Sequence, residues 1–345
     1  MKYKSCHLIE HGISIDVNSV KACCLSRGFN KGMLMILPKF ENSTIDWEHL
    51  FFVKRNHRNH QRNGRDLPAC EGCYNLREED WDEDDYISYI NFDHWSRCNS
   101  NCIYCGVQRH KPKAENNVLN AVKELIKMGK FRTNGEITFQ GGEPAVLKEF
   151  GDLLNLFLKQ GCKVRVHSSG IDFSRALRNG IKKGAASVVI SPDASFPETY
   201  RRIKRVDRFD DVWKNIKHYR KGLKDGNEKL VKVKFIIIPG LNDHYNEVTE
   251  FLNKIKQYDI KSVVVDFEYT YANRNKGEIS PHLFILNDYI EHFCLENGIE
   301  YLLYDSARYA ENDRTFEKTK DFSEEYLRKE IDKYKRENFT KNIRY

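Results

Sequence analysis

Residues 86–106 read YISYINFDHWSRCNSNCIYCG, an apolar run that leads directly into three closely spaced cysteines. The run Tyr86–Phe92 predicts a buried β-strand, and the segment behind it predicts a loop at the carboxyl end of that strand. Cys98, Cys102 and Cys105 have the spacing Cys-x3-Cys-x2-Cys, which ten cysteines in 345 residues would produce by chance in roughly one chain in a hundred. The spacing therefore indicates that these thiols share a chemical role.

Short apolar runs alternate with longer amphipathic stretches through the middle of the chain. Further strands are predicted over Glu136–Phe139, Lys163–His167, Ser187–Ser191, Val231–Ile238 and Ser262–Phe267. Helices are predicted over Val118–Met128, Phe150–Leu158, Arg175–Lys183, Phe209–Leu223 and Tyr245–Lys256. This alternation predicts an α/β fold of parallel βαβ units, in either a doubly wound sheet or a full or partial (β/α) barrel. Both architectures place chemistry at the carboxyl ends of the strands.

Composition divides the chain into three regions, which we expect to be separate parts of the fold. Residues 1–85 hold five of the ten cysteines and a short strand pattern at Gly12–Val17, so we predict a small cysteine-rich auxiliary domain. Residues 86–275 carry the strand–helix alternation. Residues 276–345 are predicted to form a helical carboxyl-terminal extension, whose last helix, Ser323–Asn338, packs on the domain through an apolar stripe.

The charge balance is modest, because 57 Lys and Arg oppose 50 Asp and Glu for a net charge of +7. The basic segment Lys54–Arg65 precedes the acidic segment Glu78–Asp85, and two blocks of opposite sign this close are expected to neutralise each other. We predict a solvated helix for the basic segment, with His57 and His60 solvated as well. This pattern does not favour a nucleic-acid partner.

No apolar run reaches the roughly 18 residues that a membrane helix needs, and the polar start carries no secretory signal pattern. We therefore expect no membrane partner and a cytoplasmic location, where thiols stay reduced. The cysteines then serve packing, catalysis or metal binding. Cys162 and Cys294 stand alone in apolar elements and are predicted to be core thiols.

Three thiolates on one loop suit a metal site that keeps one coordination position open. They can hold three irons of a cubane iron–sulfur cluster, whereas a closed cluster takes four cysteines. Two other interpretations are a zinc site completed by His94 or His110, and three buried thiols without metal. Structural zinc usually takes its ligands in pairs from two separate knuckles, so a single loop favours iron–sulfur.

A second motif follows the next predicted strand, where Glu136–Phe139 runs through a glutamine into the Gly-Gly-Glu-Pro segment at residues 141–144. Two glycines at a strand end let a ligand approach the backbone closely. Together with the three-cysteine loop, this motif resembles the radical S-adenosylmethionine (SAM) superfamily, over about residues 86–275. The resemblance implies a partial (β/α)6 TIM-like barrel whose three cysteines hold a [4Fe–4S] cluster, with SAM on the open iron.

The resemblance also implies contacts between individual residues and SAM. The methionine amine would be taken up by Gly141, Gly142 and Glu143, and the adenine would lie against Tyr104. Polar contacts from the end of the fourth strand are implied for Ser191 and Asp193, and a basic partner for the SAM carboxylate is Arg205 in preference to Lys204.

The implied activity is reductive cleavage of SAM to a 5′-deoxyadenosyl radical, which abstracts hydrogen from a polar substrate. The substrate classes that fit are a sugar, nucleotide-sugar or glycan first and a ribosomal peptide next, with flavodoxin or ferredoxin as an electron donor. Substrate contacts after the sixth strand are predicted for Asp266, Glu268, Tyr269 and Tyr271. Two alternatives are an RNA-modifying enzyme of the same superfamily and a zinc-stabilised, non-catalytic binding protein.

The cysteines of residues 1–85 form a second candidate set. Its members are Cys6, Cys23, Cys24, Cys70 and Cys73. The segments around residues 13–24 and 64–74 resemble the twitch or SPASM modules that carry an auxiliary [4Fe–4S] cluster, which four of these thiols would close. Only one of the adjacent pair Cys23–Cys24 can point at the cluster, and the spacing does not choose between them. A zinc site or no metal are the alternatives.

Overall fold

The computed structural model describes residues 2–17, 19–23, 44–65, 67, 70, 73, 75–107, 116–224, 226–274, 279–312, 314–315 and 317–338. The chain forms two compact units, which are described separately below. Unit 1 comprises Met1–Cys98 and Val107–Val166, and unit 2 comprises Asn99–Gly106 and His167–Tyr345. The boundaries of these units differ from the composition boundaries at residues 85 and 275, and the division into three domains stays a proposal.

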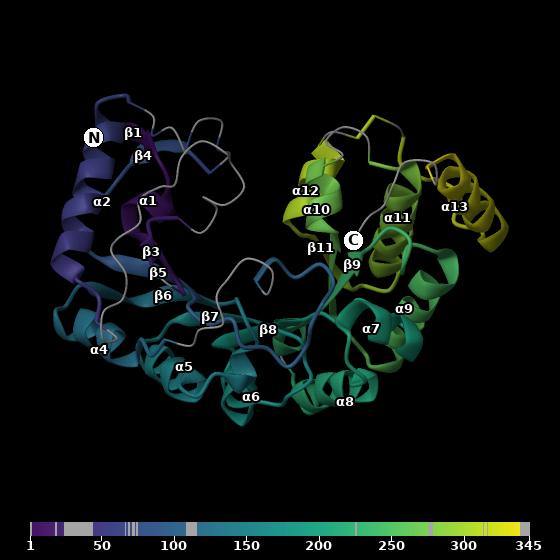
Figure 1. The fold of residues 1–345 in the computed structure, drawn as a ribbon, viewed down its shortest axis with the longest axis horizontal. Helices are drawn as coiled ribbons and strands as arrows, with labels where there is room; N and C mark the ends of the chain where they lie inside the picture. Colours follow the sequence, from purple (N-terminus) through teal and green to yellow (C-terminus); the bar gives the residue numbers. More distant parts are fainter. Residues whose placement is uncertain are drawn as a thin grey trace. The chain divides into compact units, whose positions relative to one another are not determined.

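The sheet of unit 1 is built from both the cysteine-rich region and the strand–helix region (Figure 1). Its strands, in spatial order, are β7 (Lys163–Ser168), β6 (Phe131–Phe139), β5 (Ile87–Asp93), β2 (Gly12–Asp16) and β3 (Val20–Lys21). Strands β2, β5, β6 and β7 run parallel, and β3 is antiparallel to β2. The strand predicted near residue 12 is confirmed, but it belongs to the same sheet as β5 rather than to a separate sheet.

Register brings the carboxyl ends of β2, β5 and β6 to one edge, since Asp16 pairs with Asp93 and Phe92 pairs with Phe139. The rings of Phe92 and Phe139 stack at 4.9 Å, and Phe157 of α5 (Phe150–Lys159) packs on Phe92. All three rings are fully buried, which contributes about 1.5–3 kcal/mol each. Helix α4 (Leu119–Lys127) completes the predicted elements of this unit.

A small antiparallel pair and two helices complete unit 1. The pair consists of β1 (Lys2–Ser5) and β4 (Arg77–Asp80), and α1 (His7–His11) follows β1 directly. The basic segment lies in α2 (Trp47–Arg62), as predicted for a helix. The predicted neutralisation of the two charge blocks is confirmed by ion pairs from α2 to the acidic segment, which are Arg55–Asp85, Arg58–Asp85 and Arg62–Glu83.

The prediction that this basic helix is solvated is wrong for one of its faces. Lys54, His57 and Arg58 are 2%, 9% and 4% exposed, whereas His60 is exposed as expected. These buried residues follow helical spacing and face β1 and α1, which α2 contacts. Charge density alone could not show this burial, because it depends on the packing of segments far apart in the sequence.

Unit 2 contributes four parallel strands to the nine-stranded sheet, in the order β8-β9-β10-β11. Its strands are β8 (Ala186–Ile190), β9 (Val231–Ile237), β10 (Ser262–Phe267) and β11 (Glu300–Leu303). Its helices are α6 (Arg175–Lys182), α7 (Pro197–Lys204), α8 (Phe209–Arg220), α9 (Tyr245–Gln257), α10 (Tyr269–Arg274), α11 (Pro281–Glu296), α12 (Asp305–Asn312) and α13 (Glu324–Asn338). One-turn 3-10 segments lie at Pro144–Val146 in unit 1 and Asn227–Leu230 in unit 2.

The two faces of these four strands differ in chemistry. Phe235 of β9 packs on Phe251 of α9, and Phe267 of β10 packs on Phe284 of α11, so these rings define the face that α9 and α11 cover. Because side chains alternate along a strand, Lys234 and Asp266 point to the opposite face. Polar side chains are therefore presented on the face of the β8–β11 strands that α9 does not cover.

Most predicted elements of the strand–helix region are confirmed within a few residues at their ends. The predicted stripe of the last helix is confirmed, because Leu327 and Ile331 are buried and α13 packs beside α11 (Figure 1). Cys162 and Cys294 are fully buried, as predicted for core thiols. Among the described residues, no helix is long and apolar enough to cross a membrane.

Candidate functional site

In unit 1, the glycine-rich turn after β6 packs directly on the segment that leads into the cysteine loop. The backbone N–H of Gly142 donates to the carbonyl oxygen of Trp95 at 3.1 Å, and the N–H of Glu143 donates to that of Arg97 at 2.9 Å. Arg97 immediately precedes Cys98. The two motifs recognised in the sequence are therefore joined by backbone hydrogen bonds.

Both positions of this turn have no room for a side chain, so each must be glycine. Gly141 has φ 107°, and a Cβ there would lie 2.5 Å from Oδ1 of Asp93. A Cβ on Gly142 would lie 2.1 Å from the carbonyl oxygen of Arg97. Real Cβ atoms do not approach so closely, so glycine lets the two segments meet.

The acidic residue of the turn holds the turn's own backbone. Glu143 is 2% exposed, and its Oε1 accepts from the N–H of Ala145 at 3.1 Å, which caps the short 3-10 segment. His94, one of the histidines that could complete a zinc site, is fully buried with its Nε2 at 3.0 Å from Oε1 of Glu149. The other candidate, His110, lies outside the described residues.

In unit 2, the rest of the cysteine loop is held against the end of α7. The N–H groups of Asn101 and Ile103 donate to the carbonyl oxygens of Lys204 and Ile203, both at 3.0 Å. These are carbonyls at the carboxyl end of a helix, which have no partner within the helix. Farther along the loop, the N–H of Cys105 donates to the carbonyl oxygen of Cys102 at 3.1 Å, and the Cys102 Sγ is 3.5 Å from the Ser100 Oγ.

A buried ion pair anchors the loop through Tyr104. Lys204 and Asp193 are 2% and 0% exposed, and the Lys204 Nζ lies 2.5 Å from the Asp193 Oδ2. The Lys204 Nζ also donates to the Tyr104 hydroxyl at 2.6 Å, and that hydroxyl donates to Asp193. Burial and the Asp193 carboxylate together raise the pKa of Tyr104, so its hydroxyl stays protonated. Burial alone would lower the pKa of Lys204, but the Asp193 carboxylate reverses this and raises it.

Asp193 is itself fixed by its neighbours. It adopts a left-handed backbone conformation with φ 53°, and its Oδ1 accepts from the N–H of Ile236 at 2.9 Å. The amide of Asn242 donates to the Asp193 carbonyl oxygen at 2.8 Å. Asp193 was predicted as a SAM contact from its place after the fourth strand, but its carboxylate in this structure ties the cysteine loop to β9.

The two remaining predicted SAM contacts lie in different surroundings. Ser191 is half-buried just after β8, and its N–H donates to the carbonyl oxygen of Ser168 at 3.2 Å. Arg205 is exposed at the carboxyl cap of α7, with φ 55°. The basic residue directed inward is Lys204, its neighbour. A role for Arg205 or Ser191 in SAM binding stays a prediction.

Polar residues gather on the face of the β8–β11 strands that α9 does not cover. The Lys234 Nζ lies 2.9 Å from the Asp266 Oδ2 and 4.4 Å from the centre of the Tyr304 ring. The Tyr304 hydroxyl in turn lies 3.1 Å from Nε2 of His167. Burial alone would lower the pKa of Lys234, but the Asp266 carboxylate raises it, so the Lys234 ammonium stays charged.

Asp266 was among the residues predicted to face substrate, while Lys234, Tyr304 and His167 were not. The two lysines of an otherwise apolar strand, Lys232 and Lys234, are the sequence signal that could have identified Lys234. The other predicted substrate contacts are placed as follows: Glu268 is buried and its Oε2 accepts from the Tyr271 N–H at 2.6 Å, Tyr271 is half-buried and Tyr269 is 56% exposed.

The amino-terminal cysteines come together in unit 1. Cys6, Cys23 and Cys70 lie in one buried cluster with Ile9, and they are 5%, 7% and 4% exposed. Cys73 is half-buried, and its N–H donates to the carbonyl oxygen of Cys70 at 2.9 Å. This is the same turn that joins Cys105 to Cys102. Burial raises the pKa of the Cys6 thiol, and the nearby Cys73 acts in the same direction. Cys24 lies outside the described residues.

A buried lysine on α2 fixes the segment that carries Cys6. The Lys54 Nζ donates to the carbonyl oxygens of Ile9 at 2.7 Å, Gly12 at 2.8 Å and Leu8 at 3.2 Å. These carbonyls surround the end of α1, where a helix leaves acceptors without partners. Burial lowers the pKa of Lys54 to about 7. Lys54 therefore positions α1, and with it Cys6, through hydrogen bonds rather than through a carboxylate.

Thiolates are the ligands of iron–sulfur clusters, so both cysteine sets have the donor chemistry that such clusters need. Among the residues that the structure describes, no three His, Cys, Asp or Glu side chains are arranged to hold a metal ion. In a cluster each thiolate binds a different iron, so the thiols need not converge on one point as the ligands of a single ion do.

Comparison with known families and proteins gives a consistent assignment. The family model of the radical SAM superfamily matches residues 93–268, just over half of the chain. GTP 3′,8-cyclase of Desulforamulus reducens is 29% identical over 183 residues, which cover 50% of this chain and 53% of that protein. GTP 3′,8-cyclase of Haemophilus influenzae is 26% identical over 187 residues, covering 53% and 54%. The chain thus spans about half the length of the curated relatives it matches.

Solved structures match a larger part of the chain. SuiB of Streptococcus suis bound to S-adenosylmethionine superimposes with a TM-score of 0.51 at 12% identity, covering 78% of this chain and 58% of that one. SuiB bound to its precursor peptide SuiA gives a TM-score of 0.50 at 11% identity, covering 88% and 73%. At such low identity these matches support the fold alone. They agree with a mixed α/β architecture of parallel strands and a helical carboxyl-terminal region.

Proposed function

Because this chain belongs to the radical SAM superfamily, whose enzymes use a [4Fe–4S] cluster and SAM, we propose that Cys98, Cys102 and Cys105 hold that cluster. When bound, the cluster and SAM supply a radical that removes a hydrogen atom from the substrate. The protein's part is to bind and orient the cofactors and the substrate and to exclude side reactions. Gly141, Gly142 and Glu143 are proposed to receive the methionine amine.

The observation that carries this proposal is the contact between the two motifs. The Gly142 and Glu143 N–H groups bond to the backbone directly before Cys98, so the turn proposed to receive SAM is tied to the first proposed cluster ligand. In unit 2, the Tyr104, Asp193 and Lys204 network holds the loop that carries the other two cysteines. A precisely oriented cofactor needs the residues that surround it to be held rigidly in this way.

The test is anaerobic reconstitution with iron, sulfide, SAM and dithionite, followed by measurement of 5′-deoxyadenosine. The wild-type chain should release 5′-deoxyadenosine, and Cys98→Ala should release none. Cys162→Ala is the matched control, because Cys162 is a buried thiol in the core of unit 1, and this variant should retain cleavage. A wild-type chain that forms no 5′-deoxyadenosine, or one matched by Cys98→Ala, contradicts the proposal.

We further propose that Cys6, Cys23, Cys70 and Cys73 hold an auxiliary [4Fe–4S] cluster of the twitch or SPASM kind. The support is the shared burial of three of these thiols and the turn that brings Cys73 to Cys70. Closed clusters take four cysteines, so a chain with both clusters would carry about eight irons.

Replacing Cys70 and Cys73 by alanine should remove about half of the iron while SAM cleavage continues. Unchanged iron content would contradict the auxiliary cluster, and zinc in the purified protein would favour the zinc alternative.

The proposed substrate is polar, and a sugar or nucleotide-sugar is the class we favour. The support is the set of polar side chains Lys234, Asp266, Tyr304 and His167, which lie together in unit 2 and give this region the polar character that a ligand rich in hydroxyls requires. The curated relatives are named for a cyclase of GTP, a nucleotide that carries a sugar. A ribosomal peptide is the second candidate. An electron donor such as flavodoxin or ferredoxin and a reducing cytoplasm complete the proposal.

The substrate proposal is tested by incubating the reconstituted enzyme with candidate nucleotide-sugars and peptides. Substrate-dependent stimulation of 5′-deoxyadenosine formation identifies the class. Lys234→Met should abolish that stimulation while leaving substrate-independent SAM cleavage, because the Met side chain keeps the length of Lys but removes its charge. Stimulation by peptides alone would overturn the preference for a sugar.

A further inference from the structure

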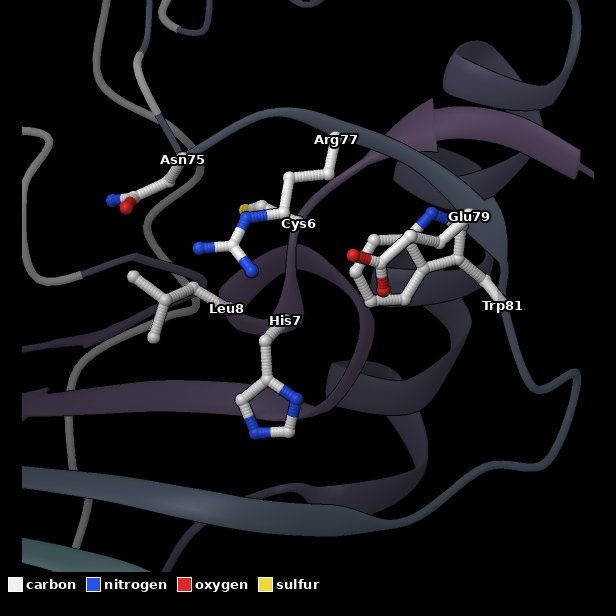
Figure 2. Close-up of a pocket in the computed structure, with 7 residues that line it drawn as sticks. All are labelled: Cys6, His7, Leu8, Asn75, Arg77, Glu79 and Trp81. Atoms are coloured by element: carbon white, nitrogen blue, oxygen red, sulfur yellow. The ribbon is translucent and has the colours of Figure 1, made fainter.

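A pocket of about 310 Å³ opens in unit 1 beside the amino-terminal cysteines. It is lined by Cys6, His7 and Leu8, where β1 passes into α1, and by Asn75, Arg77, Glu79 and Trp81 on and around β4 (Figure 2). Its size is at the lower end of the range for small-molecule sites. Apart from Cys6, none of its lining residues has a role in the proposed function.

Two opposite charges line the pocket without neutralising each other. Arg77 and Glu79 are two positions apart on β4, opposite Ser5 and Tyr3 of β1, so both point to the same face. Both side chains are exposed, and among the described residues neither forms an ion pair. Figure 2 shows the Arg77 guanidinium directed into the pocket toward the side of Leu8 and His7. Glu79 and Trp81 also line the pocket.

The remaining walls are held in place by hydrogen bonds to the protein. The Trp81 Nε1 donates to the carbonyl oxygen of Tyr3 at 3.0 Å, which fixes the indole. The His7 Nε2 lies 3.2 Å from the Ser88 Oγ, which fixes the imidazole. A wall that is already ordered costs a ligand little entropy on binding, and the indole offers a flat apolar surface for contact.

We propose that this pocket binds a small dipolar ligand, which presents a carboxylate or phosphate to Arg77 and an ammonium or other N–H donor to Glu79. A guanidinium matches the geometry of a carboxylate or phosphate and can bind it with two parallel hydrogen bonds. The Asn75 amide adds a neutral donor and acceptor on the same side of the pocket. The ligand lies against Cys6 and is therefore next to the proposed auxiliary cluster, although the recognition itself does not depend on that cluster.

Trp81 makes the binding measurable in the full chain. The other three tryptophans, Trp47, Trp95 and Trp213, are at most 2% exposed, while Trp81 is half-buried in the pocket wall. A ligand-dependent change in tryptophan fluorescence that disappears in Trp81→Phe therefore reports on this pocket. Two probes carry the proposed chemistry from different sources: glycylglycine has a carboxylate and an ammonium, and guanosine monophosphate has a phosphate and N–H donors. Inorganic phosphate is the probe that has the oxyanion alone.

Arg77→Gln should weaken binding of every probe by about tenfold, which is what loss of a charged hydrogen bond costs. Glu79→Gln should weaken glycylglycine or guanosine monophosphate and leave inorganic phosphate unchanged or bound more tightly. The matched controls are Glu78→Gln, on the opposite face of the same strand, and Arg175→Gln, an exposed arginine of α6 in unit 2, and both should bind as wild type. Tighter binding of glycylglycine would indicate a ligand that presents a carboxylate, and tighter binding of guanosine monophosphate would indicate one that presents a phosphate.

Two outcomes would overturn the proposal. One is no Trp81-dependent change with either dipolar probe at about 10 mM, a concentration that would fill even a site with a Kd near 1 mM. The other is a loss of iron in Arg77→Gln, which would make the pocket part of the cluster site rather than a ligand site. The second outcome would contradict the ligand site but not the auxiliary cluster. An iron loss confined to the cysteine variants would be consistent with the ligand site. The two proposals can therefore fail independently of each other.

Discussion

Gly142 and Arg97 approach so closely that a Cβ on Gly142 would lie 2.1 Å from the Arg97 carbonyl oxygen. The Glu143 N–H donates to that same oxygen at 2.9 Å. The turn after β6 and the entrance to the cysteine loop are thus packed backbone against backbone, and the absence of a side chain at residue 142 permits it. The general preference for glycine in turns does not by itself predict this close approach of the two backbones.

Gly142→Ala is expected to abolish most SAM cleavage. The added methyl group must push the turn away from Arg97, which breaks the two backbone hydrogen bonds that align the motifs. A displacement of about 1 Å at a reacting centre can cost about a hundredfold in rate. The measurement is 5′-deoxyadenosine formation by the reconstituted enzyme. Gly151→Ala, in α5 where a Cβ meets nothing within 4 Å, is the control and should keep full activity. Equal activity of the two variants would show that the close approach is not needed.

Lys204→Met is expected to destabilise unit 2 and loosen the cysteine loop. Removing the cation leaves the Asp193 carboxylate buried without its partner, at a cost of about 3–5 kcal/mol. The measurement is the free energy of unfolding from a denaturant titration. Arg205→Ala at the adjacent, exposed position should change it by less than about 0.5 kcal/mol. If the two variants have the same stability, the ion pair does not hold the loop as described.

Cys23→Ala and Cys24→Ala are expected to differ in iron content. Cys23 lies in the buried cluster with Cys6 and Cys70, so its loss should remove the auxiliary cluster and lower the iron from about eight to about four per chain. Cys24→Ala should keep about eight. Iron analysis after anaerobic reconstitution makes the comparison, and a loss of iron confined to Cys24→Ala would reverse the assignment.

The carboxylate of Asp243 is expected to make stability depend on pH in the acid range. His282 lies 2.8 Å and Lys335 of α13 lies 3.0 Å from its oxygens. Burial alone would raise its pKa, but the hydrogen bond and charge of His282, aided by Lys335, lower it from 3.8 to about 2. Because the folded pKa lies below the unfolded one, the stabilisation is fully present above about pH 4 and is lost as the pH falls toward 2.

The matched measurement is urea unfolding of the wild type and of Asp243→Asn. At about pH 6 the variant should be less stable by roughly 2 kcal/mol, and the difference should shrink as the pH approaches 3 and below. Asp321→Asn is the control, because Asp321 is an exposed carboxylate whose pKa is lowered only by its hydrogen bonds to Ser323, and it should show a smaller dependence on pH. A gap between wild type and Asp243→Asn that stays constant down to the lowest pH would contradict the assignment.

The strands, helices and motifs of the central region could be predicted because their signals are local. Short, mainly apolar runs mark β9 and β10, and the cysteine and glycine spacings mark the two loops that follow β5 and β6. The burial of His57 and the membership of β2 in the main sheet could not be predicted in this way. Both depend on which distant segment lies opposite, and the charge of residues 54–65 pointed to solvent.

The sequence by itself determined the family of this protein, through three closely spaced cysteines on one loop and a glycine pair at the next strand end, within a parallel strand–helix alternation. These patterns involve residues close together in the chain, so they can be recognised in the sequence without knowing the fold. Only the tertiary structure decided that Cys23 joins Cys6 and Cys70, and that Lys204 rather than Arg205 turns inward to Asp193. Adjacent residues differ little in sequence signal, but in a helix or strand they point in different directions, and folding alone determines which direction is the interior.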